Sequence, residues 1–506
     1  MPGPFNHPLT SPRQQTARIP TGVPGLDAVL GGGLPGHHTY LVEGGHGAGK
    51  TMLSLQFCIA GAQRGERVLY LSTCESEEDI REIAHAHDWS LEGVHLHYLD
   101  PQEILGETPA QSVFHPAEIE LPQMVDTLLS VIAASDPQRL VIDSLAEIRL
   151  LADSPRWFRS QVLALGKHLA DRSCTILFCD DQLDERESGQ SIVHGVIRLE
   201  QRARDYGPDR RRLRITKLRG HPFYSGYHDM AIRTGGLEVY PRLVAAEHRQ
   251  EVAPAVISSG LPELDALFGG GIDRSTATLL LGPSGTGKSI LASQFAVAAA
   301  GRGERAALYL FDERVHTFLR RAQGLGIDLT GQRDRGRIEL QQVDPAEMTP
   351  GEFSHQVQQA ITERDVRLVV IDSLAGYAHA MPDERWLTLH LHELLAYLSQ
   401  QQITVLLVMA QHGLPGTPRH VSFDLSYIAD SVLLFHAFEY AGEIRKVISA
   451  YKRRGGAHEA ALRELRFGPK GIGIGAPLRQ FEGILTGTPH FTGEELTPID
   501  PHHDQS

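Results

Sequence analysis

The chain carries the same phosphate-binding motif twice, and each copy needs a defined piece of structure around it. The pattern G-x-x-x-x-G-K-[ST] occurs at 44–51 and at 282–289. Each copy follows an apolar run and precedes a helix-like stretch, which is the strand–loop–helix context of the motif. Backbone N–H groups of such a loop wrap phosphate oxygens, and the N-terminus of the helix adds partial positive charge. The sequence therefore predicts two nucleotide sites.

The side chains of each loop have separate tasks. The lysine is expected to reach the β- and γ-phosphates, and the hydroxyl of Thr51 or Ser289 is expected to reach Mg²⁺. We therefore predict ATP and Mg²⁺ as cofactors of both copies. The predicted nucleotide-binding residues are Gly45, His46, Gly47, Ala48, Gly49, Lys50 and Thr51 in the first loop and Ser284, Gly285, Thr286, Gly287, Lys288 and Ser289 in the second.

Composition excludes several classes of protein. A net charge of −14 argues against a protein built around the DNA backbone, because such proteins neutralise phosphates with Lys and Arg. Four cysteines show no metal-binding spacing and fit a reducing compartment. No apolar run is long enough to span a bilayer, and no signal-peptide core is present. We expect a cytoplasmic protein without a membrane or nucleic-acid partner.

The duplication extends well beyond the loops. The segment 21–27 recurs at 259–265, an interval of 238 positions that also separates Gly49 from Gly287. With 506 residues, the chain is long enough for two domains. The predicted organisation is an N-terminal arm at 1–18, a first domain at 19–247, a second domain at 248–491 and a C-terminal tail at 492–506.

Short apolar runs alternate with helical segments in both copies. Such continuous apolar strands indicate an α/β fold with a parallel sheet covered on both faces, and ligands then bind at the carboxyl ends of the strands. The expected strands are 39–42, 68–71, 140–142 and 175–178 in the first copy and 278–281, 307–310, 368–371 and 404–408 in the second.

Acidic residues follow two of these strands in each copy. Asp143 and Asp372 end apolar runs, as in a Walker B motif whose carboxylate helps to hold Mg²⁺. Glu75 and Glu313 follow the second strand and are candidates for the carboxylate beside the γ-phosphate. The alternative for all four residues is the capping of a following helix or turn.

Cations recur late in each copy. Lys217 and Arg219 correspond to Lys452 and Arg454, and they are either an exposed strand face or arginine-finger-type residues that reach the nucleotide of a neighbouring subunit. A finger that acts in trans implies a ring or filament. The run 210–214 is interpreted as a solvated strand face or hairpin rather than as a nucleic-acid patch, because no aromatic residues interleave it.

These residues resemble the KaiC family, double-domain members of the RecA-like ATPases. The resemblance covers roughly 19–491 and rests on the segments that end at Asp27 and Asp265, both loops, both Asp-Ser strand ends and both K-x-R-G segments. It implies two tandem RecA-like P-loop domains, each a mostly parallel sheet flanked by helices. It also implies a homohexameric ring with ATP between subunits, an ATPase first domain, an autokinase second domain, and small clock or signalling proteins as partners.

The sequence departs from the family pattern at the acidic pair. The family carries Glu-Glu, whereas this chain has Cys74-Glu75 and Asp312-Glu313. Because Cys74 is no carboxylate base, hydrolysis in the first domain should be impaired or should rely on Glu75. Asp312 is a catalytic candidate in the second domain, although its side chain is shorter than that of Glu.

The phosphoacceptor position also differs. The resemblance implies phosphorylation at Ser426, which matches the serine of the family's Ser-Thr pair, while Tyr427 replaces the threonine. The leading hypothesis is an ATP-hydrolysing serine autokinase in bacterial signalling or a circadian clock. The alternatives are a RecA- or DnaB-like nucleic-acid-dependent ATPase, which the acidic charge disfavours, and a nucleotide-gated signalling scaffold, which Cys74 favours.

Overall fold

The computed structural model describes residues 17–99, 116–150, 154–170, 173–181, 189–204, 207–244, 255–379, 384–411, 427–486 and 489–492. The chain forms two compact units, 1–242 and 243–506. The finer domain limits at 247 and 491 stay predictions. Among the helices in the described ranges, none is both long enough and apolar enough to cross a membrane.

A nine-stranded sheet forms the centre of the first unit. From β8 to β5 the neighbouring strands run parallel, and β9, β10 and β11 extend the sheet antiparallel. The four predicted strands are present as β3, β7, β6 and β4. The order is β11 (Gly236–Tyr240), β10 (His228–Arg233), β9 (Arg210–Leu218), β8 (Gly195–Arg202), β3 (Thr39–Gly44), β7 (Thr175–Asp180), β6 (Arg139–Asp143), β4 (Val68–Ser72) and β5 (Val94–Tyr98).

The second unit repeats this topology. Its strands from β16 to β19 run parallel, and β20, β21 and β22 form the antiparallel extension. The four predicted strands correspond to β14, β15, β17 and β18. The order is β16 (Ile338–Gln342), β15 (Arg305–Leu310), β17 (Val366–Asp372), β18 (Thr404–Gln411), β14 (Ala277–Pro283), β19 (Ser431–Tyr440), β20 (Glu443–Arg453), β21 (Arg463–Gly468) and β22 (Gly471–Pro477).

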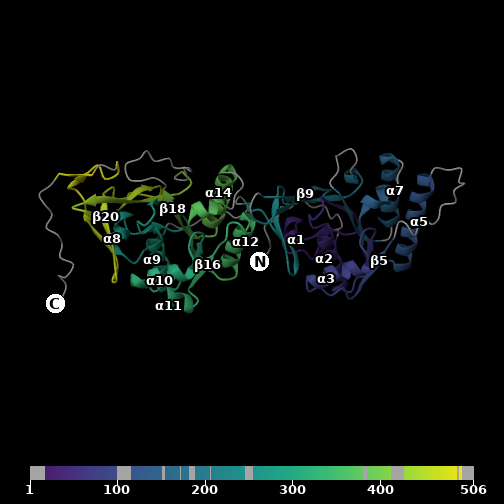
Figure 1. Cartoon of the computed structure of the whole chain (residues 1–506), viewed down its shortest axis with the longest axis horizontal. Helices are drawn as coiled ribbons and strands as arrows, with labels where there is room; N and C mark the ends of the chain where they lie inside the picture. Colours follow the sequence, from purple (N-terminus) through teal and green to yellow (C-terminus); the bar gives the residue numbers. More distant parts are fainter. Residues whose placement is uncertain are drawn as a thin grey trace, which may run out of the picture. The chain divides into compact units, whose positions relative to one another are not determined.

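Helices cover both faces of each sheet (Figure 1). In the first unit, one core lies beneath α1 (Leu26–Val29), α2 (Lys50–Ala62) and α3 (Glu77–Ala86). A second core lies beneath α5 (Pro116–Ser135), α6 (Leu145–Leu150) and α7 (Pro155–Ala170). Because both faces are covered, the central strands are apolar throughout, as the sequence pattern predicts.

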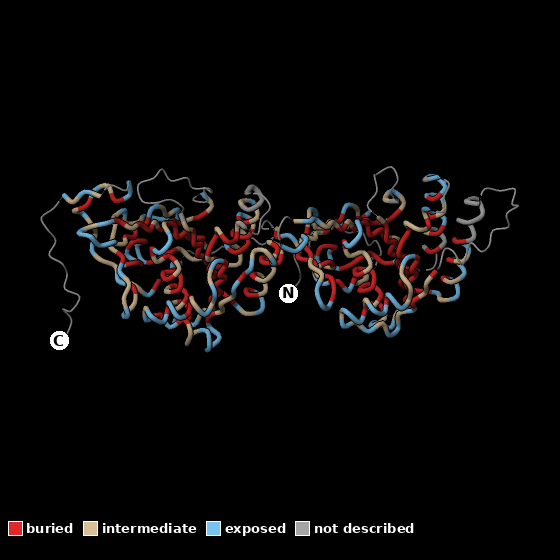
Figure 2. Tube along the Cα trace, viewed as in Figure 1, coloured by how far each residue is buried: buried red, intermediate tan, exposed pale blue. Residues whose placement is uncertain are grey.

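The second unit also has a core on each face of its sheet. Four helices cover one face: α8 (Pro262–Leu267), α9 (Lys288–Gly301), α10 (Val315–Gly324) and α11 (Leu329–Asp334). Three cover the other: α12 (Pro350–Thr362), α13 (Leu374–His379) and α14 (Glu384–Gln400). Figure 2 shows buried central strands and exposed outer helix faces in both units.

Short elements complete the two units. The pair β1 (Arg18–Ile19) and β2 (Leu34–Pro35) precedes the first loop, and β12 (Val256–Ile257) with β13 (Ile272–Asp273) takes the same place in the second unit. A 3₁₀ turn, η1 (Gly189–Ser191), precedes β8. The pair β23 (Phe481–Glu482) and β24 (His490–Phe491) follows the second sheet.

Candidate nucleotide and catalytic sites

Both phosphate-binding loops join a central strand to the N-terminus of a helix. The first connects β3 to α2, and the second connects β14 to α9. Gly49 and Gly287 have φ angles of 105° and 104°, a backbone region that favours glycine. A Cβ at Gly287 would lie 1.9 Å from the Phe467 ring, so that glycine is required on two grounds. The loops therefore have the geometry that the motif predicts.

The two loop lysines meet different environments. Lys50 Nζ donates to the Gly44 carbonyl at 2.6 Å and forms an ion pair with Asp181 at 3.1 Å. Lys288 Nζ donates to the carbonyls of Gly282 and Pro283, at 2.7 Å each. Burial lowers the pKa of Lys288 to about 8. Nothing in the motif itself indicates this difference, because Asp181 lies 131 positions away from Lys50.

The predicted Walker B aspartates lie beside the loop hydroxyls. Thr51 Oγ1 donates to Asp143 Oδ2 at 2.8 Å, and the Tyr70 hydroxyl donates to the same oxygen at 2.7 Å. In the second unit Ser289 donates to Asp372, whose pKa is raised by burial to about 6. The nearby charge of Arg321 opposes that rise. Hydroxyl and carboxylate oxygens are the ligand types that Mg²⁺ prefers.

The first residues of the two acidic pairs occupy equivalent places. Cys74 Sγ lies 3.6 Å from the Ser144 hydroxyl, and the Ser373 hydroxyl donates to Asp312. Each of these serines directly follows the Walker B aspartate of its unit. The cysteine therefore stands where the second unit has a carboxylate, beside the predicted metal site.

The second residues of the pairs are not helix caps. Ser76 caps α3 through a capping box, and Arg314 occupies the N-cap position of α10. Burial raises the pKa of Glu75, and the Asp143 charge adds to this effect. Glu313 instead forms an ion pair with Arg321, 2.7 Å from Nη2 to Oε2. Arg321 is not predicted by the repeat, because the first unit carries no cation at the matching position.

Lys217, Arg219, Lys452 and Arg454 lie at the end of the sheet where the parallel strands begin. The phosphate-binding loop of the same unit lies at the other end, where these strands finish. Lys217 pairs across the sheet with Val196, which in turn pairs with Leu41 of β3. The loop begins after Gly44, about 10 Å further along β3 at the usual rise of a strand. Lys217 therefore lies well away from the nucleotide site of its own unit.

Both units tether these cations in the same way. Lys217 donates to the Gln190 carbonyl and Lys452 to the Ala429 carbonyl, at 2.5 and 2.8 Å. Arg219 donates to the Ser191 carbonyl, and Arg454 donates to the Tyr427 carbonyl. The carbonyls come from the residues that lead into β8 and β19. The repeated tethering favours a shared task over an unspecific strand face.

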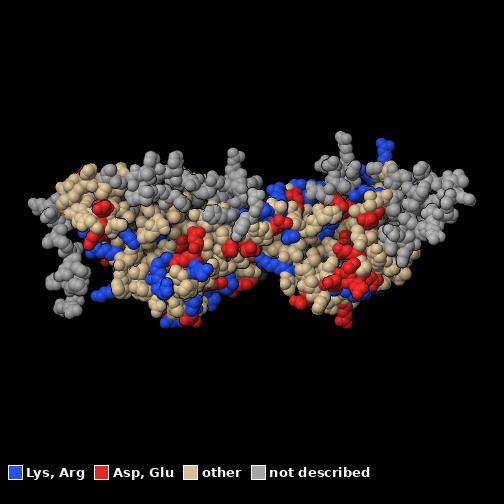
Figure 3. All heavy atoms as spheres, viewed as in Figure 1, with Lys and Arg blue, Asp and Glu red and all other residues tan. Residues whose placement is uncertain are grey.

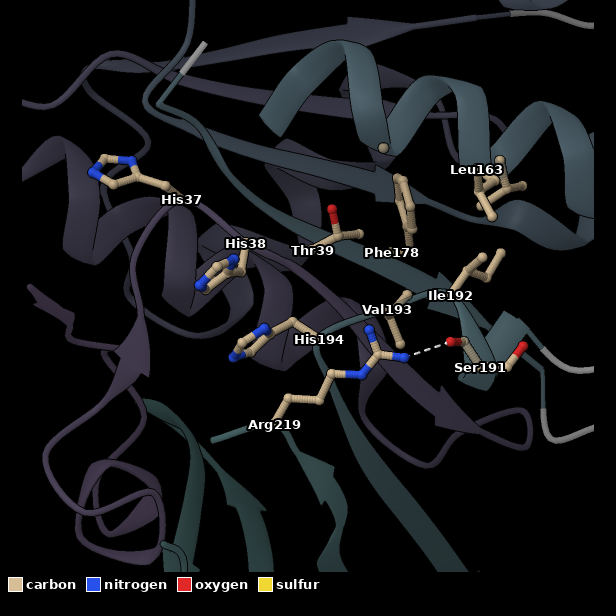
Figure 4. Close-up of a pocket in the computed structure, with 12 residues that line it drawn as sticks. His37, His38, Thr39, Leu163, Phe178, Ser191, Ile192, Val193, His194 and Arg219 are labelled. Carbon is tan, nitrogen blue, oxygen red and sulfur yellow. Dashed lines mark hydrogen bonds between the residues drawn. The ribbon is translucent and has the colours of Figure 1, made fainter. Parts of the chain in front are cut away.

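Arg219 adjoins a cavity of about 360 Å³ at that end of the sheet (Figure 4). The rings of His38 and His194 stack along it, with 3.8 Å between their centroids. Burial lowers the pKa of His194 to about 4, and the His38 ring adds to this effect. Arg219 is the only Arg, Lys, Asp or Glu among the described lining residues. Near neutral pH it gives this wall its positive charge.

The arginine run 210–214 lies in the antiparallel strand β9, as the strand-face interpretation predicts. Arg212 forms an ion pair with Glu200 at 2.6 Å and lies 3.5 Å above the Tyr227 ring. Arg211 Nε donates to the Gly47 carbonyl at 3.2 Å, which places a cation beside the first loop. Arg211 is not among the predicted nucleotide-binding residues, although Lys446 takes the same position in the strand pairing of β20.

One predicted residue, the phosphoacceptor Ser426, lies outside the described residues. Its neighbour Tyr427 is described and is 55% exposed. Arg454 therefore contacts the chain one residue beyond the predicted acceptor.

Comparisons with known proteins cover both units. The family model for the KaiC ATPase matches residues 19–244 and 257–479. The circadian clock oscillator protein KaiC of Picosynechococcus sp. is 27% identical over 93% of this chain and 92% of its own length. The circadian clock protein KaiC3 of Synechocystis sp. is 28% identical over 94% and 95%, respectively. The KaiC oscillator protein of Synechococcus elongatus is 26% identical over 95% and 94%.

The pKa of Lys288 leads to a testable pH dependence. In a Lys50→Ala protein, which keeps only the second loop intact, we expect affinity for a non-hydrolysable ATP analogue to fall as pH rises from about 7 to 9. A lysine of pKa about 8 is charged at pH 7 but mostly neutral at pH 9, and a bound phosphate favours the charged form. The affinity should approach a tenfold loss per pH unit above that pKa.

Titration calorimetry in buffers of different ionisation enthalpy measures both the affinity and the accompanying proton uptake. Net uptake near pH 8 is expected. A flat affinity between pH 7 and 9 without proton uptake would contradict the prediction.

Proposed function

The chain belongs to the KaiC family of ATPases, and we propose that its second unit also transfers the γ-phosphoryl group of ATP to Ser426 of an adjacent subunit. On this proposal the first unit hydrolyses ATP. The two units then use the same phosphate-loop architecture for different acceptors, water in the first and a serine hydroxyl in the second.

The placement of Arg454 carries the proposal. Its guanidinium donates to the carbonyl of Tyr427, the residue after Ser426, and lies 3.5 Å from Asp430. Both contacts are at the end of the sheet opposite the Lys288 loop. From this end Arg454 would approach the γ-phosphate of a neighbouring subunit's ATP rather than that of its own unit, and on this proposal the acceptor next to Tyr427 in the sequence meets the same ATP.

The carboxylate and hydroxyl pairs fit a Mg²⁺ ion. Thr51 with Asp143 would hold it in the first unit, and Ser289 with Asp372 in the second. When bound, Mg²⁺ neutralises charge on the phosphate oxygens. Lys288 and the backbone N–H groups of the loop would bind the remaining phosphate oxygens.

The chain's own residues account for the transfer. The Ser426 oxygen attacks the γ-phosphorus, the bond to the ADP oxygen breaks, and Glu313 accepts the serine proton and later releases it to water. Asp312, which accepts a hydrogen bond from Ser373, lies with Glu313 at the carboxyl ends of the strands, the same end of the sheet as the Lys288 loop. In the first unit Glu75 would orient the attacking water, since Cys74 supplies no carboxylate.

Assembly and partners follow from the transfer in trans. We propose a homohexamer, because a heterologous contact that closes gives each loop a neighbour's Lys217–Arg219 or Lys452–Arg454 segment. The relatives named above are circadian clock proteins. For this chain we propose a role in bacterial signalling, of clock type or otherwise, with small signalling proteins as partners.

The acceptor assignment is tested by Ser426→Ala. Incubation with γ-labelled ATP and Mg²⁺ is expected to label the parent protein, and the variant should lose at least about nine-tenths of the label because its acceptor oxygen is gone. Tyr427→Phe is the matched control, which should retain most of the label. Equal labelling of Ser426→Ala and parent would exclude Ser426, and mapping the phosphorylated peptide would identify the true acceptor.

A further inference from the structure

The helices that follow the two acidic pairs carry opposite charge. On α3, Glu77, Glu78, Asp79 and Glu82 accompany the single Arg81, whereas α10 carries Arg320 and Arg321 and no acidic residue. Figure 3 shows Asp and Glu gathered over α3, and Lys and Arg over α10 and α11. The two sites thus differ in the charge that surrounds their candidate catalytic glutamates.

In the second unit, Arg321 forms a bidentate ion pair with Glu313. Nη2 lies 2.7 Å from Oε2, and Nη1 donates to Oε1 at 3.0 Å. A bidentate pair of this kind fixes the plane of the carboxylate as well as its position. The Arg321 guanidinium is also 5.3 Å from the centre of the Phe318 ring, a buried residue of the same helix. The contact with Phe318 on α10 therefore helps to hold the Arg321 guanidinium in the position where it pairs with Glu313.

The same arginine lies within electrostatic range of the Walker B carboxylate. Its charge acts on Asp372, which Ser289 contacts at the phosphate loop. Arg321 therefore forms an ion pair with the candidate base Glu313 and also adds positive charge near Asp372. Among the described contacts it forms no hydrogen bond with Asp372 or with the loop.

The first unit lacks this arrangement. The matching residue, 238 positions earlier, is Ile83, which packs against the core. The equivalence is supported by the buried pairs Ile80 with Phe318 and Ala84 with Ala322, which keep the same interval. In the part of the chain that the structure describes, no Lys or Arg forms an ion pair with Glu75. The two internal copies therefore provide a natural comparison with and without the arginine.

We propose that Arg321 is a positioning residue for phosphoryl transfer in the second unit, where it holds the Glu313 carboxylate in the orientation that receives the proton of the attacking hydroxyl. The inference rests on the proposed function of Glu313. A base that is already oriented saves the reorganisation that a free side chain requires, and small misplacements of a catalytic group cost up to about 100-fold in rate. Arg321 itself touches no reacting atom.

The test uses the full-length protein with Asp143→Asn, which silences the first site. Arg321→Met keeps the length and packing of the side chain but removes the bidentate contact. We expect kcat for label incorporation to fall by about 10-fold or more, with KM for ATP changed less than about two-fold, since the loop contacts remain. Arg321→Lys should recover part of the loss. Arg320→Met, an exposed arginine on the same helix, is the matched control and should keep full activity.

A double-mutant cycle separates positioning from a general structural effect. If Arg321 acts through Glu313, Arg321→Met should cause no further loss in a Glu313→Gln protein. Additive losses, an effect confined to KM, or unchanged kcat in Arg321→Met would overturn the inference. If the parent and Arg320→Met incorporate no label, the autokinase proposal fails. ATP hydrolysis by the second unit is then measured in the same variants. The role of Arg321 is decided by whether Arg321→Met lowers the kcat for hydrolysis and whether this loss disappears in the Glu313→Gln protein.

Discussion

Asp372→Asn is expected to lower phosphate incorporation into this protein by roughly 100-fold or more, while Asp143→Asn leaves incorporation within a few-fold of the parent. The magnitude is typical of losing one electrostatic contribution to a phosphoryl-transfer site. The reason is local. Asp372 lies at the loop of the unit that contains Glu313 and the predicted acceptor, and the asparagine amide removes the charge that would hold Mg²⁺. The remaining oxygen still accepts the Ser289 hydrogen bond.

The converse holds for ATP hydrolysis by the first unit. Asp143→Asn should reduce it strongly, because Asp143 accepts hydrogen bonds from both Thr51 and Tyr70 at that site. Label incorporation and release of inorganic phosphate, measured on the same samples, separate the two activities. The aspartate variants are preferable to loop lysine variants, since both phosphate-binding loops stay intact.

Native mass spectrometry supplies the control, because transfer in trans needs an assembled ring. If both variants form rings and both lose incorporation equally, the two units act as one catalytic system and the division of labour is wrong. If Asp143→Asn alone loses incorporation, the kinase site is in the first unit.

The sequence predicted those parts of the site that one short segment encodes. The loop lysines, Thr51 and Ser289 lie within their motifs, and the Walker B aspartates end apolar strands that only a buried parallel sheet accommodates. The near-constant interval between the two copies strengthened these assignments, because every motif recurs at the matching position of the second copy.

Contacts between distant segments were not predictable in this way. Lys50 follows β3 and forms an ion pair with Asp181, which follows the neighbouring strand β7. The second copy has Ala410 at the position that matches Asp181, so the repeat gave no indication of this ion pair. Arg321 was missed for the same reason, since its counterpart is Ile83. Of the antiparallel extension of each sheet, only the strand at 210–214 was predicted, because the other strands of the extension have no continuous apolar run.

Removing the Arg454 guanidinium is expected to reduce phosphoryl transfer by about 1000-fold, the scale of an arginine finger. The same change at Arg219 should act on first-unit hydrolysis and leave incorporation largely intact. Arg466→Ala, an exposed arginine of the second unit, is a control that should change neither activity. Arg454→Ala alone, however, does not distinguish a finger in trans from an arginine that only holds the Tyr427 carbonyl of its own chain.

Mixed rings make that distinction. Arg454→Ala subunits keep a complete ATP loop, whereas Lys288→Ala subunits keep Arg454 and the acceptor segment but have an impaired loop. If Arg454 reaches the ATP of a neighbour, mixing two almost inactive variants restores label, and the label appears on the Lys288→Ala chain, which a mass tag identifies. An unlabelled mixture with intact rings would show that each chain needs both residues itself. Label on the Arg454→Ala chain would mean that the acceptor receives phosphate from the ATP bound by its own chain. The proposal of transfer in trans would then be wrong.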